Sequence, residues 1–277
     1  MTGAALAAPF ALTSGTSRAH AAPHAGRLKQ GVCLGVFKGL KVDFDTKCRI
    51  AAEVGAVGID LVGPKSFPTL KKYGLIPTMV PGGSGIKKGI NDPANHAAIE
   101  SRMRQALKDA ASVGAPNVIV LAGDRANLTD EAGLENSVRF LNRIKGQAED
   151  LGVTLCLELL NSKVNHPGYM ADHMAWGAAL CQQVNSPRVK LLYDIYHMQI
   201  MEGDIIRTIR ENIQHIGHFH TAGNPGRHQF DQSQELYYPA ICRAIADLNF
   251  QGFLSHEYTP TKDPVGTLKE MMRLCQV

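Results

Sequence analysis

The sequence predicts an α/β protein, a (β/α)8 (TIM) barrel that forms a single domain. Its 277 residues are 44% hydrophobic and 19% charged, which is typical of a globular chain and long enough for one barrel. From Lys29 onward, short apolar runs rich in β-branched residues alternate eight times with longer amphipathic segments. This alternation is typical of helices joining the strands of a parallel sheet. No linker or low-complexity block interrupts residues 28–277, so eight such units favour a closed barrel.

The first four units begin with apolar runs bounded by polar or glycine-containing segments, as expected for strands. These strands are expected at 32–36, 57–62, 75–80 and 117–121. The segments after them have helical periodicity, and helices are expected at 46–54, 67–73, 95–113 and 131–151. Gly55 and Gly74 follow the first two helices and suit their C-terminal ends. A glycine-rich loop, Pro81–Gly85, precedes the third helix.

The last four units repeat the pattern up to the end of the chain. Their strands are expected at 153–158, 189–194, 213–220 and 252–257. Their helices are expected at 170–184, 204–212, 237–248 and 265–275. The strands are apolar along most of their length, which fits burial on both faces of a parallel sheet.

Residues 1–27 differ from the rest and are expected to lie outside the barrel of residues 28–277. The apolar run Gly3–Leu12 and the small-x-small triplet Ala19–Ala21 resemble the second half of a secretory signal with its cleavage site. No Lys or Arg precedes Arg18, so the basic start of such a signal is missing. Two interpretations stay open: a truncated export signal of a periplasmic or secreted protein, or a disordered extension of a cytoplasmic one.

Composition excludes several classes of partner. The net charge of +4 comes from 29 basic and 25 acidic residues that are spread along the chain, without the basic block expected of a nucleic-acid-binding protein. The longest apolar run is too short to span a membrane. The six cysteines form no CxxC pair and lie mostly in apolar runs, which indicates free buried thiols. A small molecule is therefore the expected partner, and self-association into a homo-oligomer is left open.

The last four predicted strands share one feature: each ends in a side chain that can bind a metal. These side chains are Glu158, Asp194, His220 and Glu257. An apolar strand that ends in a charged group needs an explanation, because burying an unpaired charge is costly. The carboxyl ends of barrel strands open at one end of the barrel, where active sites lie. Adjacent strands are about 4.8 Å apart, so four successive strand ends can surround one ion.

The predicted ligand set indicates one divalent ion. Three carboxylates and one imidazole are mostly hard donors, which suit Mn²⁺, Mg²⁺ or Co²⁺ better than a structural zinc ion. Each acid taken alone could instead cap the following helix or pair with a basic side chain. Four such residues at equivalent positions on consecutive strands favour the metal.

Other polar residues are expected near this site. His197 follows the sixth strand and could bind substrate or orient a ligand. Asn161 follows the fifth strand and is likewise expected to contact substrate or to support a ligand. Arg227, in the loop after the seventh strand, could bind a carboxylate or a carbonyl oxygen. His218 is expected to be an interior histidine, and His256 to point to the opposite face from Glu257.

With these residues identified, the chain resembles the xylose-isomerase-like barrel superfamily, and within it the hydroxypyruvate isomerases. The resemblance covers most of residues 30–262. It is carried by the stretches Leu157–Asn161, Tyr193–Asp204, Ile216–His220, Pro225–His228 and His256–Tyr258. The run Asp-x-Tyr-His-x-Gln-x-x-x-Gly-Asp, which begins at Asp194, is the most specific of them.

The resemblance implies a metal site and assigns roles to its residues. The family's ligands fall on Glu158, Asp194, His220 and Glu257. Its acid/base pair falls on the two glutamates, and its substrate contacts fall on His197 and Arg227. Two positions depart from the hydroxypyruvate isomerases: His220 resembles the related ketose 3-epimerases, and Gly63 stands where many members have an acid after the second strand.

Two glutamates beside one divalent ion suggest an aldose–ketose-type isomerase. The ion would bind adjacent carbonyl and hydroxyl oxygens, and the glutamates would move a proton through an enediolate. The resemblance favours hydroxypyruvate as substrate and tartronate semialdehyde as product. The alternatives are a ketose 3-epimerase, a keto-sugar lyase or a non-catalytic sugar-binding barrel.

Overall fold

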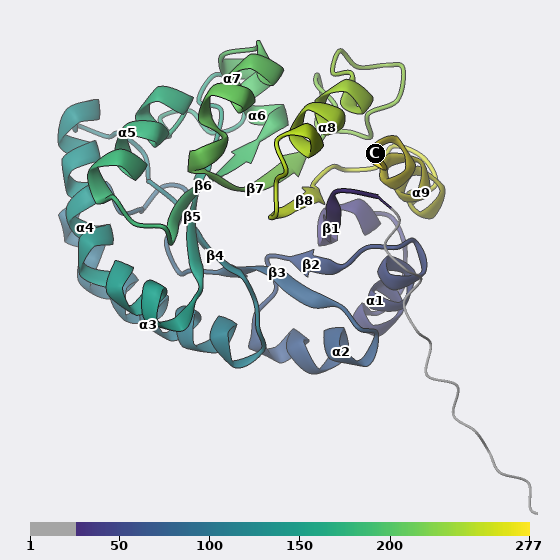
Figure 1. Cartoon of the computed structure of the whole chain (residues 1–277), viewed down its shortest axis with the longest axis horizontal. Helices are drawn as coiled ribbons and strands as arrows, with labels where there is room; N and C mark the ends of the chain where they lie inside the picture. The colour runs from purple at the N-terminus through teal and green to yellow at the C-terminus, as the bar shows by residue number, and fades with distance from the viewer. Residues whose placement is uncertain (1–25) are drawn as a thin grey trace, which may run out of the picture.

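The structure of the protein is a computed structural model that describes residues 26–277, so the expectations for residues 1–25 lie outside it. Eight strands pair in parallel and in chain order, and β8 pairs with β1 to close the barrel (Figure 1). The strands are β1 (Lys29–Cys33), β2 (Gly58–Asp60), β3 (Ile76–Pro81), β4 (Asn117–Val120), β5 (Thr154–Leu159), β6 (Val189–Asp194), β7 (Ile216–Thr221) and β8 (Phe253–His256). The predicted (β/α)8 fold is confirmed.

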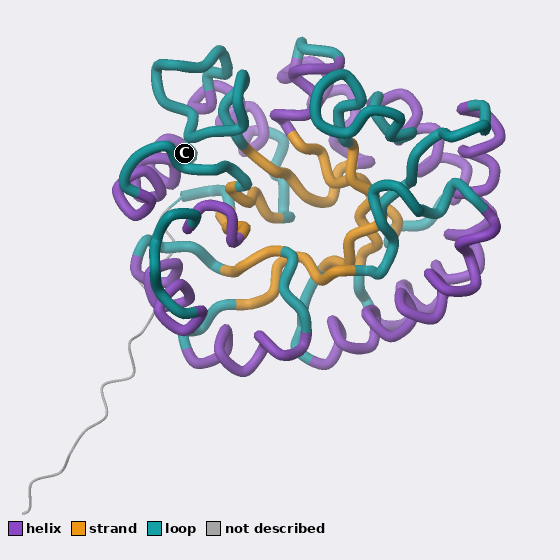
Figure 2. The backbone as a smooth tube through the Cα atoms, turned by 180° about the vertical axis from the view of Figure 1, so that it is seen from behind, coloured by secondary structure: helices purple, strands orange, loops and turns teal. Residues whose placement is uncertain are grey.

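Helices surround the barrel and connect its strands, as the ring of helices outside the strands in Figure 2 shows. The α-helices are α1 (Phe44–Glu53), α2 (Phe67–Lys72), α3 (His96–Ser112), α4 (Asp130–Leu151), α5 (Met174–Val184), α6 (Ile195–Met201), α7 (Ile205–Asn212), α8 (Tyr238–Asp247) and α9 (Pro264–Leu274). Short 3-10 helices lie at Leu34–Phe37, Pro64–Ser66, Pro93–Asn95 and Ile213–His215. Within residues 26–277 no helix is long and apolar enough to cross a membrane.

The helix ends follow local sequence signals. Asp43 precedes α1, and its side chain accepts a hydrogen bond from the backbone N–H of Thr46. Thr129 caps α4 in the same way, and Gly152 ends that helix with a left-handed φ of 68°. Side-chain caps satisfy backbone N–H groups that have no partner within the helix, so these residues fix where each helix begins.

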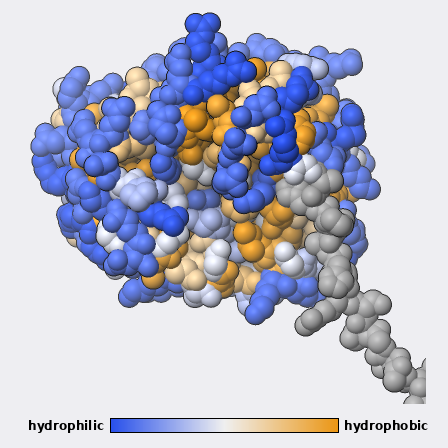
Figure 3. Space-filling view, viewed as in Figure 1, coloured by the Kyte–Doolittle hydropathy of each residue, from blue (hydrophilic) through white to orange (hydrophobic). Residues whose placement is uncertain are grey.

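The core has two parts. The larger part lies between the strands and the surrounding helices, and a small cluster of Met79, Ile119, Cys156 and Leu192 fills the barrel interior. On the face shown in Figure 3, hydrophilic residues predominate around the rim and hydrophobic residues are visible between them. Packing on both sides of the strands explains why their sequences are apolar and continuous.

β1 and β2 end more than one residue earlier than the sequence predicted. β1 stops at Cys33, because Leu34–Phe37 forms a 3-10 helix instead of continuing the strand. β2 stops at Asp60, and Leu61 has a left-handed φ of 59° that turns the chain out of the strand. An acid, Asp60, is therefore the last residue of β2 and precedes Gly63 in the chain.

The loop after β3 packs tightly on the loop after β4. A methyl group at Gly89 would lie 2.1 Å from the carbonyl carbon of Ala122 and 2.2 Å from the amide nitrogen of Gly123. We expect Gly89→Ala to lower the free energy of unfolding by about 1–3 kcal/mol. Gly146→Ala in α4 is the control, because nothing lies within 4 Å of the added methyl, and it should raise stability by about 0.5–1 kcal/mol. Urea unfolding measures both, and equal stability of the two variants would contradict the tight packing.

Candidate metal centre and active site

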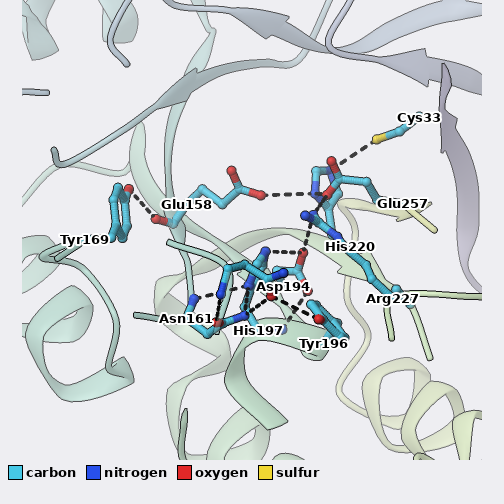
Figure 4. A network of polar contacts seen from close by, with 12 residues as sticks. Cys33, Glu158, Asn161, Tyr169, Asp194, Tyr196, His197, His220, Arg227 and Glu257 are labelled. Carbon is cyan, nitrogen blue, oxygen red and sulfur yellow. Dashed lines mark hydrogen bonds and ion pairs between the residues drawn. The ribbon is translucent and has the colours of Figure 1, made fainter. Parts of the chain in front are cut away.

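The four predicted ligands converge at the mouth of the barrel, which is the end where the carboxyl termini of the strands open. Glu158 lies on β5, Asp194 ends β6, His220 lies on β7, and Glu257 directly follows β8. One ligand atom from each lies within 4.8 Å of those of the other three. Consecutive strands therefore bring the four side chains together, and Figure 4 shows them facing a common point.

His220 is at the centre of this group and is fully buried. Its Nδ1 lies 2.8 Å from Oε2 of Glu257 and 3.3 Å from Oε1 of Glu158. Neither contact forms a hydrogen bond, so Nδ1 is a buried nitrogen without a hydrogen-bond partner among the described residues. Its Nε2 lies 2.9 Å from Oδ2 of Asp60 on the other side of the ring.

This geometry fits a divalent cation. Three carboxylates and one ring nitrogen present lone pairs to the same space, and oxygen with imidazole is a donor set suited to Mg²⁺ or Mn²⁺. Without a cation, the carboxylates around His220 favour the protonated form of its ring. Burial opposes charge on His220, but Glu257 and Asp60 nevertheless hold the pKa of its ring well above the usual range.

The two glutamates have opposite electrostatic surroundings. Burial raises the pKa of Glu158, and the neighbouring carboxylates of Glu257 and Asp194 raise it further. Burial also disfavours the charged form of Glu257, but His220 and Arg227 outweigh it and lower the pKa of Glu257 to about 2. In the absence of a metal ion, these surroundings therefore shift the pKa values of the two carboxyl groups in opposite directions.

His197 is held at the edge of the site by two neighbours. The Asp194 carboxylate accepts a hydrogen bond of 3.0 Å from the His197 backbone N–H, which starts α6 at the end of β6. The backbone N–H of Asn161 donates to Nδ1 of His197 at 3.1 Å. The neutral ring therefore carries its proton on Nε2, which is buried and has no hydrogen-bond partner in the described chain.

The side chain of Asn161 contacts His197 and the backbone of the loop after β5. Its amide lies against Nδ1 of His197, and its Oδ1 accepts from the backbone N–H groups of Val164 and Asn165. Asn161 thus orders the loop after β5 and orients His197.

Arg227 reaches the site from the loop after β7. Its guanidinium lies 2.7 Å from the Glu257 carboxylate and 3.5 Å from that of Asp194. It also lies over the ring of Tyr196, 5.6 Å from the centroid. Burial opposes the charge of Arg227, but the site carboxylates outweigh it and raise the pKa of the guanidinium, so it is a permanent cation at the mouth.

Three residues near the site were not singled out by the sequence. Asp60 was missed because the second strand was extended past it. Cys33 ends β1, and its buried thiol lies 3.9 Å from Nε2 of His220. His166 lies in the loop after β5 with its ring centroid 5.4 Å from that of His197. Neither Cys33 nor His166 carries a signal in the sequence, because the role of each depends on a contact with a residue distant in the chain, His220 and His197 respectively.

Two predictions for other histidines are confirmed. His218 is an interior residue with 0% exposure, and its Nε2 lies 2.7 Å from Oδ2 of Asp60. His256 points away from the site, where its two ring nitrogens contact Thr221 and Gln30.

Comparisons with known proteins agree with this architecture. The family described as "Xylose isomerase-like TIM barrel" matches residues 68–276. The chain is 32% identical over 180 residues to a Homo sapiens protein named "Putative hydroxypyruvate isomerase", and the match covers 62% of this chain and 64% of that protein, less than two thirds of its length. It is 33% identical over 186 residues to a "2-oxo-tetronate isomerase" of Cupriavidus necator, with 64% and 69% covered.

A solved structure supports the same assignment. A protein titled "AP endonuclease, family 2" from Brucella melitensis is 25% identical and superposes with a TM-score of 0.80 over 87% of this chain and 96% of that one. Together with the closed barrel, these matches identify the chain as a member of the xylose isomerase-like TIM barrel family.

Proposed function

We propose that this protein is a divalent-metal-dependent isomerase that acts on a small hydroxy-carbonyl substrate, with hydroxypyruvate as substrate and tartronate semialdehyde as product. The observation that carries the proposal is the convergence of two glutamates, one aspartate and one histidine at the mouth of the barrel. The names of the human and Cupriavidus necator relatives support an isomerase.

The residues divide into metal holders and proton carriers. Glu158, Asp194, His220 and Glu257 would hold the ion. When bound, a divalent ion neutralises the cluster and polarises the carbonyl and hydroxyl oxygens of a substrate. Asp194 and His220 serve only as ligands, whereas the two glutamates also carry protons: one removes the proton next to the carbonyl group, and the other returns a proton to the neighbouring carbon.

Two further residues would orient the substrate. His197 offers a buried Nε2–H that has no other partner in residues 26–277, so it can donate to a substrate oxygen. Arg227 presents a planar guanidinium that can bind a carboxylate through two N–H groups. Its contacts with Glu257 and Asp194 place this cation beside the ligands, where the carboxylate of hydroxypyruvate would be close to the reacting carbons.

A ketose 3-epimerase is the second candidate. Glu158 and Glu257 come from β5 and β8, which are not adjacent strands, and both lie against the ring of His220. Glutamates that approach from different strands could remove a proton from one face of a carbon and return one to the other. His220 itself favours this alternative, since it is the position that resembles the ketose 3-epimerases.

A substrate panel distinguishes these functions. Purified protein loaded with Mn²⁺ or Mg²⁺ is incubated in D₂O with hydroxypyruvate and, separately, with ketopentoses and ketohexoses, and the products are identified by NMR and mass. We expect deuterium incorporation and turnover of hydroxypyruvate to tartronate semialdehyde. Inversion at one ketose carbon would establish an epimerase, and a product lighter by one water would establish a lyase. A protein that binds neither Mn²⁺ nor Mg²⁺ and turns over no substrate of the panel in their presence would overturn the proposal and favour a non-catalytic barrel.

A further inference from the structure

A second polar cluster lies directly beneath the ligands, inside the barrel. It consists of Asp60 at the end of β2 and of His218 and His220 on β7. These side chains come from opposite parts of the sheet and are all fully buried, with 0% side-chain exposure. One carboxylate oxygen of Asp60, Oδ2, lies 2.7 Å from Nε2 of His218 and 2.9 Å from Nε2 of His220.

The surroundings of the cluster fix the direction of each hydrogen bond. The side-chain amide of Asn117 donates to the backbone carbonyl of Thr78 at 3.0 Å, and the same nitrogen lies 3.4 Å from Nδ1 of His218. Nδ1 of His218 is thus an acceptor, and its Nε2–H donates to Asp60. The other oxygen of Asp60 accepts from the Thr78 hydroxyl. Both oxygens of this carboxylate are therefore occupied by donors.

This arrangement sets the tautomer of His220. Asp60 is a carboxylate that only accepts, so the Nε2 of His220 that faces it carries the proton. In the neutral ring, which is the form that binds a metal, the lone pair is then on Nδ1, and this atom faces Glu158 and Glu257 (Figure 4). Metal-binding histidines commonly donate their second N–H to a carboxylate that orients the ring and increases its basicity.

We propose that Asp60 is a positioning residue: it holds the His220 ring with its proton on Nε2, so that Nδ1 is presented to a divalent cation together with the three carboxylates. His218 and Thr78 anchor Asp60 in turn. The inference rests on the proposed metal-dependent function, but it concerns metal affinity and requires no substrate.

A separate metal site within the lower cluster is the competing explanation, because Asp60, His218 and His220 also lie within 4.8 Å of one another. The hydrogen bonds argue against it. Each ring nitrogen that faces Asp60 is a donor, and the remaining oxygen of Asp60 is taken by Thr78. A cation there would have to displace all three donors.

The test compares Mn²⁺ affinity, measured by calorimetry, in wild type, Asp60→Asn and Asp60→Ala. The asparagine keeps a carbonyl acceptor without charge, whereas the alanine removes the acceptor. We expect the dissociation constant to rise about 10-fold in Asp60→Asn and up to about 100-fold in Asp60→Ala, with one ion per chain in wild type. The matched control is Asp172→Asn, a second buried carboxylate that pairs with Arg125 and contacts none of the four ligands. Its Mn²⁺ affinity should be unchanged.

A measurement on the wild-type protein covers the case in which the variants do not fold. In Mg²⁺-loaded protein labelled with ¹⁵N-histidine, NMR should show His220 protonated on Nε2. A proton on Nδ1, wild-type affinity in folded Asp60→Ala, an equal loss in Asp172→Asn, or a second Mn²⁺ per chain would each overturn the inference. Failure of the wild type to bind any metal would instead count against the proposed function.

Discussion

Glu158→Gln and Glu257→Gln should each lower kcat of the metal-loaded protein by a factor on the order of 10²–10⁴. The reason is that each carboxylate moves a proton as well as binding the ion, and an amide cannot accept that proton. Glutamine retains the shape of the side chain and one oxygen donor, so metal binding should weaken less than turnover. Steady-state kinetics on the substrate identified by the panel, with metal content measured on the same samples, separate the two effects.

The control for this prediction is Glu202→Gln. Glu202 follows α6, and its carboxylate accepts a hydrogen bond from the backbone N–H of Met174 at 3.0 Å, away from the four ligands. Its loss should leave kcat unchanged. Wild-type turnover in both Glu158→Gln and Glu257→Gln would falsify the assignment of the proton carriers.

The four candidate ligands at the barrel mouth could be predicted from the sequence because the relevant signal is local. β5 and β6 are mostly apolar before Glu158 and Asp194, with Lys190 near the start of β6 the one earlier charge, and a carboxylate near the end of a buried strand is conspicuous. The predicted bounds of β6 match the observed strand, Val189–Asp194. Once the fold class is known, the convergence of strand ends follows from barrel geometry.

Asp60 could not be found in the same way. β2 has only three residues, and the apolar residues Leu61 and Val62 continue its pattern after the strand has ended. The turn is set by the backbone of Leu61, which no composition rule reveals. The partners of Asp60 are His218 and His220, 158 and 160 residues away in the chain, so their contact arises only when the barrel closes.

At the start of α6, Asp194 both caps the helix and belongs to the candidate ligand group. Asp194 was predicted as a ligand, with helix capping as its alternative explanation. In the structure its Oδ1 caps α6 through the His197 backbone N–H, while a carboxylate oxygen also belongs to the ligand group. The two explanations are compatible, because a carboxylate has enough lone pairs for both. Capping fixes the orientation that the proposed metal binding would require.

Divalent metal should stabilise the protein strongly. At a free ion concentration 100 times the dissociation constant, binding to the folded state alone contributes about 2.7 kcal/mol. For a chain of this size that corresponds to a rise in Tm of roughly 5–10 °C. A thermal melt with and without Mn²⁺ measures the shift, and a chelator should reverse it. An unchanged Tm at millimolar Mn²⁺ would contradict the proposed site.

Asp194→Asn should raise the Tm of the metal-free protein and lower the Tm gain that metal binding gives. Burial raises the pKa of Asp194 above its ordinary value of 3.8, and Glu257 raises it further against the opposing effect of Arg227. An acid whose pKa is higher in the folded state destabilises that state when it is ionised. At pH 7 and without metal, the neutral amide should therefore raise Tm above that of wild type, and this advantage should vanish as the pH falls below about 4.

With metal present, the same substitution removes a ligand, so Asp194→Asn should lose most of the Mn²⁺-induced rise in Tm. Asp172→Asn provides the opposite case. Burial disfavours ionised Asp172, but hydrogen bonds from Arg125 and Ser162 outweigh it and lower the pKa of Asp172. Its carboxylate therefore stabilises the fold, and Asp172→Asn should lower the metal-free Tm while keeping the full metal-induced rise. If both variants behaved alike, the buried charge of Asp194 would be structural, and the carboxylates at the mouth would not be held together for a cation.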